Sequence, residues 1–165
     1  MRKANHLQGR WQNAVFFLIG LLIVVADQFS KTWIRTNLPE GRSLFETGFL
    51  RITHVHNTGA AFGLFPDQSL ALIVVALIGI TAILAYVLVI YRYFPLPDGM
   101  LGKLALGLVF GGTVGNLIDR LRFGYVIDFI DFGFWPAFNV ADSAITVGVI
   151  IFAYSLLRLA RAEKR

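Results

Sequence analysis

Four apolar stretches, separated by short polar connections, constrain the fold of this chain more than any other feature. Residues 69–91 contain no charged side chain, and at about 1.5 Å per residue they can cross the roughly 30 Å hydrocarbon core of a bilayer. The other stretches cover residues 14–33, 104–118 and 144–157, and the last two need flanking residues to complete a span. All five prolines lie between the stretches, so none of them interrupts a helix.

These stretches predict a membrane all-α fold, with four transmembrane helices and a small β-containing extracytoplasmic loop region. The composition agrees, because 56% of the residues are hydrophobic, only 15% are charged, and the mean hydropathy of +0.67 exceeds that of soluble domains. The first stretch could instead be a cleaved signal peptide, but no small-x-small cleavage site follows it. We therefore expect one membrane domain over residues 1–165, with helices at about 13–33, 69–92, 100–120 and 139–159.

The distribution of charge predicts the orientation. With four spans both termini face the same side, which then holds nine basic and two acidic residues, against six basic and eight acidic residues on the other side. The positive-inside rule places the termini, and the side with the basic excess, in the cytoplasm. This asymmetry explains the high isoelectric point without a nucleic-acid partner, and it places the candidate catalytic carboxylates on the outer side.

The outer loop, at about residues 37–68, is the one sizeable region expected outside the membrane. Residues 49–55 alternate well enough for a strand that could pair with residues 44–45, which predicts a small sheet on the outer membrane surface. Residues 57–63 contain the small and turn-forming residues of a tight loop.

Several kinds of chemistry have no support in the sequence. There is no cysteine, which excludes disulfides, thiol nucleophiles and zinc–thiolate sites. Neither a phosphate-binding glycine loop nor a Gly-x-Ser-x-Gly elbow is present. His54 and His56 share one face of the expected strand, but no metal-binding spacing accompanies them. We therefore predict no metal and no cofactor.

Two aspartates flank the last apolar stretch and are the leading candidates for catalysis. Asp142 has a structural alternative, because Asn139 could cap the fourth helix and place Asp142 at its third position. Asp128 lies in an apolar and aromatic run, where a carboxylate must find a partner or raise its pKa. Two carboxylates close enough to share a proton can activate water against a peptide bond. The residues alone do not say which of the two holds the proton.

Other polar groups gather near the same membrane face. Asp27 and Lys31 are one helical turn apart and could form an ion pair, and Asp119 and Arg120 could form another at the end of the third helix, close to Asn116. Glycines 107, 111 and 115 lie on one helix face, which favours close helix packing, with room for a substrate backbone or lipid chain as the alternative.

Five sequence motifs, in order along nearly the whole chain, resemble those of the lipoprotein signal peptidases (signal peptidase II). They are ADQ at 26–28, NTGAAF at 57–62, GGTVGNLIDR at 111–120, VIDF at 126–129 and FNVADS at 138–143. Members of this family are aspartic peptidases of the bacterial cytoplasmic membrane.

The resemblance implies specific roles. Asp128 and Asp142 would form the catalytic dyad, Asp27 would support the structure around it, and the residues that line the site or hold the substrate would be Asn57, Gly59, Asn116, Arg120 and Asn139. The substrate would be a prolipoprotein whose cysteine carries diacylglycerol, cleaved just before that cysteine. We expect a monomeric, multi-pass inner-membrane enzyme in contact with membrane lipid, with both termini cytoplasmic and the active site near the outer face.

Two other function classes fit parts of the sequence. A small transporter or channel could use Asp27, Asp119 and Arg120 as a polar path, but such a path requires charges near the bilayer midplane. A non-catalytic scaffold could bind signal peptides without cleaving them.

Overall fold

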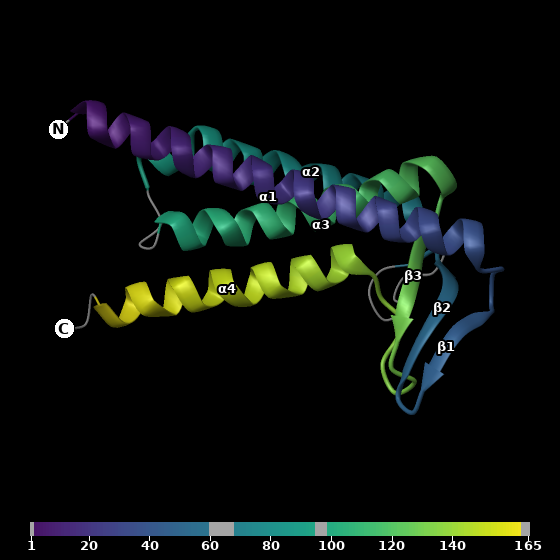
Figure 1. Ribbon diagram of the computed structural model, residues 1–165. Helices are drawn as coiled ribbons and strands as arrows, with labels where there is room; N and C mark the ends of the chain where they lie inside the picture. Colours follow the sequence, from purple (N-terminus) through teal and green to yellow (C-terminus); the bar gives the residue numbers. More distant parts are fainter. Residues whose placement is uncertain (1, 60–67, 95–98, 163–165) are drawn as a thin grey trace.

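A computed structural model describes residues 2–59, 68–94 and 99–162 of the protein (Figure 1). Its long helices are α1 (Arg2–Asn37), α2 (Ser69–Leu88), α3 (Gly99–Phe123) and α4 (Val140–Ala162), and a short 3-10 helix, η2 (Ile90–Arg92), follows α2. Its strands are β1 (Ser43–Thr47), β2 (Leu50–Asn57) and β3 (Val126–Asp131). The predicted fold class, four apolar helices with a small sheet, is confirmed.

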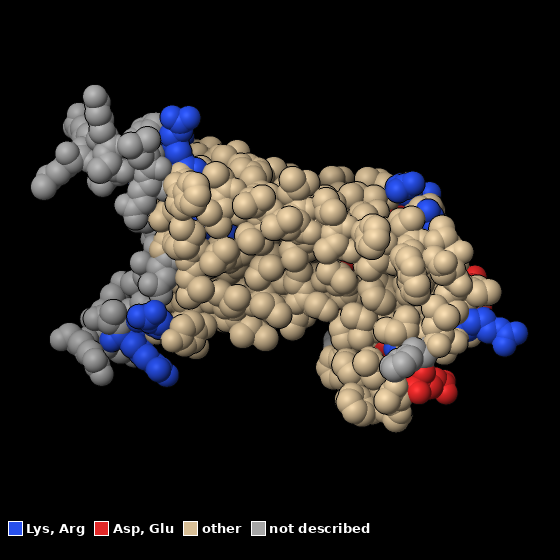
Figure 2. Space-filling view, viewed as in Figure 1, with Lys and Arg blue, Asp and Glu red and all other residues tan. Residues whose placement is uncertain are grey.

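Each long helix contains a segment long and apolar enough to cross a membrane: Gly9–Asn37, Ser69–Arg92, Gly99–Phe123 and Val140–Arg158. The helices run side by side, with both chain termini at one end and the sheet at the other (Figure 1). On the face shown in Figure 2, Lys and Arg gather at the two ends of the bundle, and the surface between them is almost free of charge. Helix α1 begins before the expected residue 13, because no proline interrupts residues 2–12 and most of them are compatible with a helix.

Glycines on α3 let two other helices approach its backbone closely. A Cβ atom on Gly107 would lie 2.9 Å from the carbonyl oxygen of Phe16, and one on Gly111 would lie 2.6 Å from that of Gly20, so both glycines face α1. A Cβ atom on Gly112 would collide with the carbonyl oxygen of Ala141 in α4. The stripe at positions 107 and 111 is therefore filled by α1, which supports helix packing over room for a substrate.

The sheet is antiparallel, in the order β1-β2-β3, and the predicted pairing of β1 with β2 is confirmed. The third strand was not predicted. It pairs with β2 so that Val126 lies opposite Asn57 and Asp128 lies opposite Val55. Ile127 and Phe129 pack with Ile34 at the end of α1 in a small buried core. This core fixes the sheet to the helices and thereby places Asp128 at the end of the bundle.

Candidate active site

Asp142 is held at the start of α4 by Asn139. The Asn139 side-chain oxygen accepts the backbone N–H of Asp142 at 2.9 Å, and Oδ2 of Asp142 accepts the backbone N–H of Asn139 at 3.2 Å. This reciprocal pair satisfies amides that the first turn of a helix leaves free. The predicted cap is confirmed, and it leaves Oδ1 of Asp142 directed to a different partner.

Asp128, in β3, is buried with 2% of its surface exposed. Its Oδ1 accepts a hydrogen bond from Nδ2 of Asn139 at 2.7 Å, and its Oδ2 accepts one from Nδ2 of Asn57 at 2.9 Å. Asn139 therefore bonds to both candidate carboxylates, through its side-chain nitrogen to Asp128 and through its backbone N–H to Asp142. A single residue brings the two aspartates into one site.

The electrostatics of this site favour a proton on Asp128. Burial raises the pKa of Asp128 to about 7, the nearby charge of Asp142 raises it as well, and the hydrogen bonds from Asn57 and Asn139 partly oppose the shift. The carboxyl group can therefore hold or release a proton near neutral pH. A buried acid beside a second carboxylate is an arrangement suited to proton transfer.

Asn116 of α3 extends this arrangement away from the carboxylates. Its Nδ2 donates to Oδ1 of Asp142 at 2.8 Å, and its Oδ1 accepts hydrogen bonds from Nζ of Lys31 at 2.8 Å and from Nδ2 of Asn139 at 3.2 Å. Since the ammonium of Lys31 can only donate, it fixes the orientation of the Asn116 amide, with the nitrogen toward Asp142.

Lys31 is the centre of a buried cluster of charges and is 2% exposed. Its Nζ lies 2.8 Å from Oδ2 of Asp27, which confirms the predicted pair, and 3.0 Å from Oδ2 of Asp119. With Asn116, these partners occupy all three N–H groups of the ammonium. The possible pair of Asp119 with Arg120 is not among the ion pairs of the described residues, because consecutive residues on a helix point in different directions. Asp119 instead faces α1 and accepts the backbone N–H of Ile127 at 3.2 Å.

Asp27 joins three helices at this point. Its Oδ1 accepts the backbone N–H of Ala141, at the start of α4, at 3.0 Å. A Cβ atom on Gly115 would lie 2.6 Å from its Oδ2, so only glycine at position 115 lets α3 pass this close to the carboxylate. Asp27 is fully buried and does not contact Asp128 or Asp142 through any hydrogen bond found in the described residues.

Arg120 is bonded to the residues that directly follow β2. Nη2 of Arg120 donates to the carbonyl oxygen of Gly59 at 3.1 Å, and the N–H of Gly59 donates to Oδ1 of Asn57 at 2.9 Å. The Nε of Arg120 is buried and has no acceptor within the described part of the chain. The predicted tight loop thus begins at Asn57, and its residues 60–63 lie outside the described residues.

Every predicted site residue therefore takes part in one connected set of hydrogen bonds and ion pairs. The sequence motifs missed the central position of Lys31 and its contact with Asp119, which Gln28 also bonds at 2.9 Å. The sequence did contain a signal for this buried cluster, namely a lysine one turn after an aspartate inside an otherwise apolar span. Such a charge is costly in a membrane and requires partners.

The two histidines of β2 form a separate group. Their Nε2 atoms lie 3.2 Å apart, and Nδ1 of His56 lies 3.0 Å from Glu40. Among residues 2–59, 68–94 and 99–162, no three His, Asp or Glu side chains are grouped so that they could hold a metal ion.

A family model described as signal peptidase (SPase) II matches residues 19–158. The chain is 48% identical over 152 residues to a lipoprotein signal peptidase of Moorella thermoacetica, covering 91% of this chain and 97% of that one. It is 50% identical over 137 residues to a lipoprotein signal peptidase of Dehalococcoides mccartyi, covering 82% and 84% of the two chains.

Two solved structures, both described as bacterial membrane enzymes, are similar to most of the chain. The first has a TM-score of 0.80 at 33% identity and covers 88% of each chain. The second has a TM-score of 0.75 at 34% identity and covers 87% of this chain and 93% of the other. Together with the four apolar helices, these structures identify a multi-pass membrane protein.

Proposed function

The chain belongs to the signal peptidase II family, and we propose that it is an aspartic endopeptidase that removes signal peptides from prolipoproteins, with Asp128 and Asp142 as its catalytic pair. Membership of this family confirms the resemblance seen in the five sequence motifs. One observation carries the assignment of the pair: Asn139 bonds to both carboxylates, in a site that raises the pKa of Asp128 to about 7.

The reaction uses the pair as one acid and one base. The ionised carboxylate takes a proton from water, whose oxygen attacks the carbonyl carbon of the scissile peptide bond. The protonated carboxyl group donates its proton to the carbonyl oxygen, which gives a tetrahedral intermediate. As the carbon–nitrogen bond breaks, a carboxyl group forms and a proton passes to the leaving amine. Burial favours Asp128 as the group that holds the proton at rest, although the pair titrates as a unit.

The residues around the pair divide into two groups. Asn116 and Asn139 hold the carboxylates through the hydrogen bonds described above, and Asp27 supports the helix junction behind them. Asn57, Gly59 and Arg120 are joined to one another and to Asp128 by hydrogen bonds, and we assign to them the binding of the substrate backbone. The N–H groups of Arg120 suit a peptide carbonyl, because a guanidinium donates and does not accept.

The position of the pair suits a substrate that enters from the membrane. The site lies where α1, α3 and α4 reach the sheet, at the end of the bundle opposite the termini (Figure 1). The basic excess near the termini supports a cytoplasmic location for them, and so an active site near the outer face of the inner membrane. At that depth a diacylglyceryl-cysteine can keep its acyl chains in lipid while the bond before it meets the carboxylates. The unit needs no second copy to complete the site, which supports a monomer.

Purified protein in detergent, given a lipidated precursor, tests this proposal. Asp128→Asn and Asp142→Asn should each abolish cleavage while the thermal melting of the protein stays near that of the unmodified chain. Asp131→Asn is the matched control, because Asp131 lies in the same strand and pairs with Arg51 at 2.7 Å, away from the site. Cleavage retained by either single variant would contradict the assignment of the pair. If the unmodified protein released no product, it would be a binding scaffold and not an enzyme.

A further inference from the structure

The sheet carries a cluster of aromatic side chains at the end away from the active site. The aromatic tip consists of Phe49, Phe132 and Phe134, whose rings are stacked, and of Trp135, which directly follows Phe134 in the chain. The ring of Phe132 lies 6.1 Å from that of Phe49 and 6.1 Å from that of Phe134, between centroids. Phe134 is 80% exposed, Phe49 69% and Trp135 50%. A group of large exposed rings on a small protein marks a surface that another medium or molecule covers.

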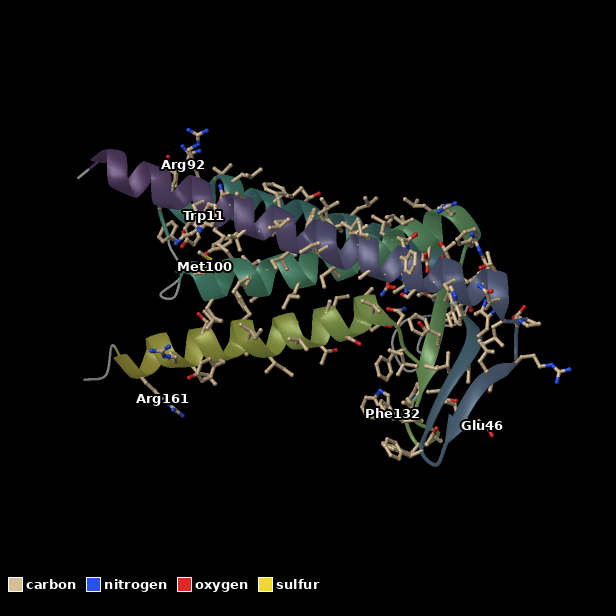
Figure 3. All side chains as sticks on the ribbon, viewed as in Figure 1. Trp11, Glu46, Arg92, Met100, Phe132 and Arg161 are labelled. Atoms are coloured by element: carbon tan, nitrogen blue, oxygen red, sulfur yellow. The ribbon has the colours of Figure 1, made fainter. Side chains whose placement is uncertain are left out.

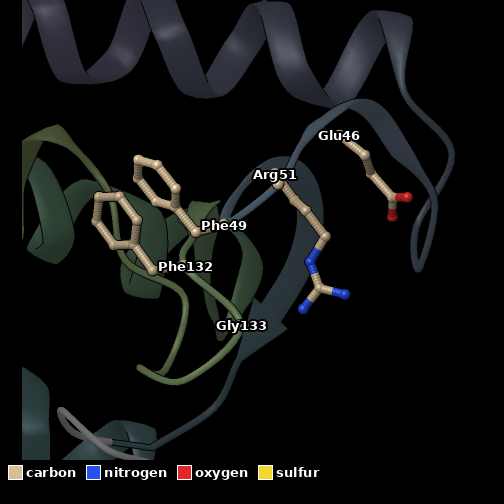
Figure 4. A pocket seen from close by; sticks show the side chains of 6 residues that line it. Glu46, Phe49, Arg51, Phe132 and Gly133 are labelled. Atoms are coloured by element: carbon tan, nitrogen blue, oxygen red, sulfur yellow. The ribbon is translucent and has the colours of Figure 1, made fainter.

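Phe49 and Phe132 lie on one side of the sheet, and charged groups lie on the other. In Figure 3 Phe132 lies on the side of the sheet toward the membrane-spanning helices, whereas Glu46 lies on the far side. Figure 4 shows the rings of Phe49 and Phe132 side by side, with the side chains of Glu46 and Arg51 directed away from them. These residues border a shallow hollow of about 320 Å³ at the tip of the sheet.

The sheet also extends sideways, beyond the outline of the helices. In Figure 1 its strands run across the long axes of the helices and reach past α4. Figure 2 shows the same lobe as an overhang, uncharged on the side facing the bundle and charged at its far edge. A leaflet that surrounds the helices would therefore lie directly beneath the overhang.

We propose that the aromatic tip rests in the headgroup interface of the leaflet at the sheet end of the bundle and anchors the sheet to the membrane. Aromatic rings, and tryptophan above all, are enriched at this depth, where the ring is in an apolar layer and its polar group stays hydrated. Glu46 and the Arg51–Asp131 pair then face water. A lipid surface fits this division better than a second copy or a soluble protein, because the rings of Phe49 and Phe132 face the membrane side of the overhang.

This contact has a mechanical consequence for the site. Strand β2 begins at Leu50, next to the tip, and ends at Asn57, which bonds to Asp128. Strand β3 runs in the opposite direction, from Val126 opposite Asn57 to Asp131 opposite Arg51. Lipid contact at the tip therefore fixes the tilt of the two strands that carry Asn57 and Asp128 relative to the helices that carry Asp142.

Tryptophan fluorescence in bilayers tests the proposal directly. Trp11→Phe and Trp33→Phe leave Trp135 as the single reporter in the full-length chain, because the chain has three tryptophans. The protein is reconstituted at high dilution in phosphatidylcholine vesicles that contain lipids brominated either near the headgroup or near the chain ends. We expect the emission of Trp135 to be largely lost with bromine near the headgroup and little changed with bromine near the chain ends. Aqueous acrylamide should quench it weakly.

The control places a tryptophan on the opposite side of the same lobe. Glu46→Trp, in a chain whose three native tryptophans are changed to Phe, should be quenched by acrylamide and not by brominated lipid. Phe134→Ser in the Trp135 reporter should shift the emission to the red and weaken quenching by lipid. Efficient acrylamide quenching of Trp135 without lipid quenching overturns the proposal. Protection of Trp135 from acrylamide that does not depend on lipid and appears only at high protein density also overturns the proposal, since it would indicate a second copy.

Discussion

Asn139 offers a sharp test of how the carboxylate pair is held, because its side-chain oxygen and nitrogen have different partners. The oxygen accepts the amide of Asp142 at 2.9 Å and caps α4, whereas the nitrogen donates to Asp128 at 2.7 Å. Asn139→Ser keeps an oxygen that can cap the helix but removes the nitrogen. Asn139→Ala removes both. The two variants therefore separate the cap from the contact with the pair.

The structure sets the size of each effect. A lost helix cap costs about 1 kcal/mol, which corresponds to a fall of about 2–4 °C in Tm for a chain of this size. A hydrogen bond to a charged group contributes about 1.5–3 kcal/mol. If that bond acts in the transition state, its loss lowers kcat/KM by about 10- to 100-fold, at about 1.4 kcal/mol for each factor of ten. Both variants should lose activity by this amount, and Asn139→Ala should melt lower than Asn139→Ser.

The assay measures cleavage of a lipidated precursor and thermal melting of the same purified samples. Activity near that of the unmodified protein in Asn139→Ser would refute the reasoning that the amide nitrogen organises the pair. Equal melting of the two variants would refute the role of the oxygen as a cap.

Three further predictions follow from the packing and the buried charges. Lys31→Met leaves the carboxylates of its cluster without their cation and should lower the free energy of unfolding by about 3–5 kcal/mol. Arg51→Ala removes a part-exposed pair and should lower it by only about 0–1 kcal/mol. Equal losses of unfolding free energy in the two variants would contradict the burial of the cluster. Gly111→Val should prevent α3 from approaching α1 and abolish folded expression, while Gly9→Val, which meets no neighbour within 4 Å, should express normally. The pKa of Asp128, raised by burial to about 7 from its ordinary value of 3.8, means that the folded state keeps a proton that the unfolded chain releases. Stability should therefore fall as pH rises from about 4 to about 7, and Asp128→Asn should flatten that dependence; an unchanged slope in the melting data would count against the shift.

The parts of the fold that depend on local sequence could be predicted. Apolar length predicted the four helices, and a spacing of four residues predicted the pair of Asp27 and Lys31. The cap of α4 followed from Asn139 three residues before Asp142. In each case the interacting groups lie within one or two turns, where helix geometry alone brings them together.

The parts that depend on distant segments could not be predicted from the residues alone. Strand β3 pairs with β2, about 70 residues earlier, and Val126 to Phe129 are buried in succession, so the strand lacks the alternation that reveals a half-exposed one. The ion pair of Lys31 with Asp119 joins α1 to α3 and exists only because the glycines of α3 bring those helices together. No local pattern contains that information.

A double-mutant cycle on cleavage by the purified protein tests the central claim, that Asp128 and Asp142 act as one catalytic pair. The rate constants of the unmodified protein, Asp128→Asn, Asp142→Asn and the double variant are compared on the same lipidated precursor. If the two carboxylates act as a unit, each single change reduces cleavage to background and the double change causes no further loss. Independent, multiplying losses from the two changes would contradict the account.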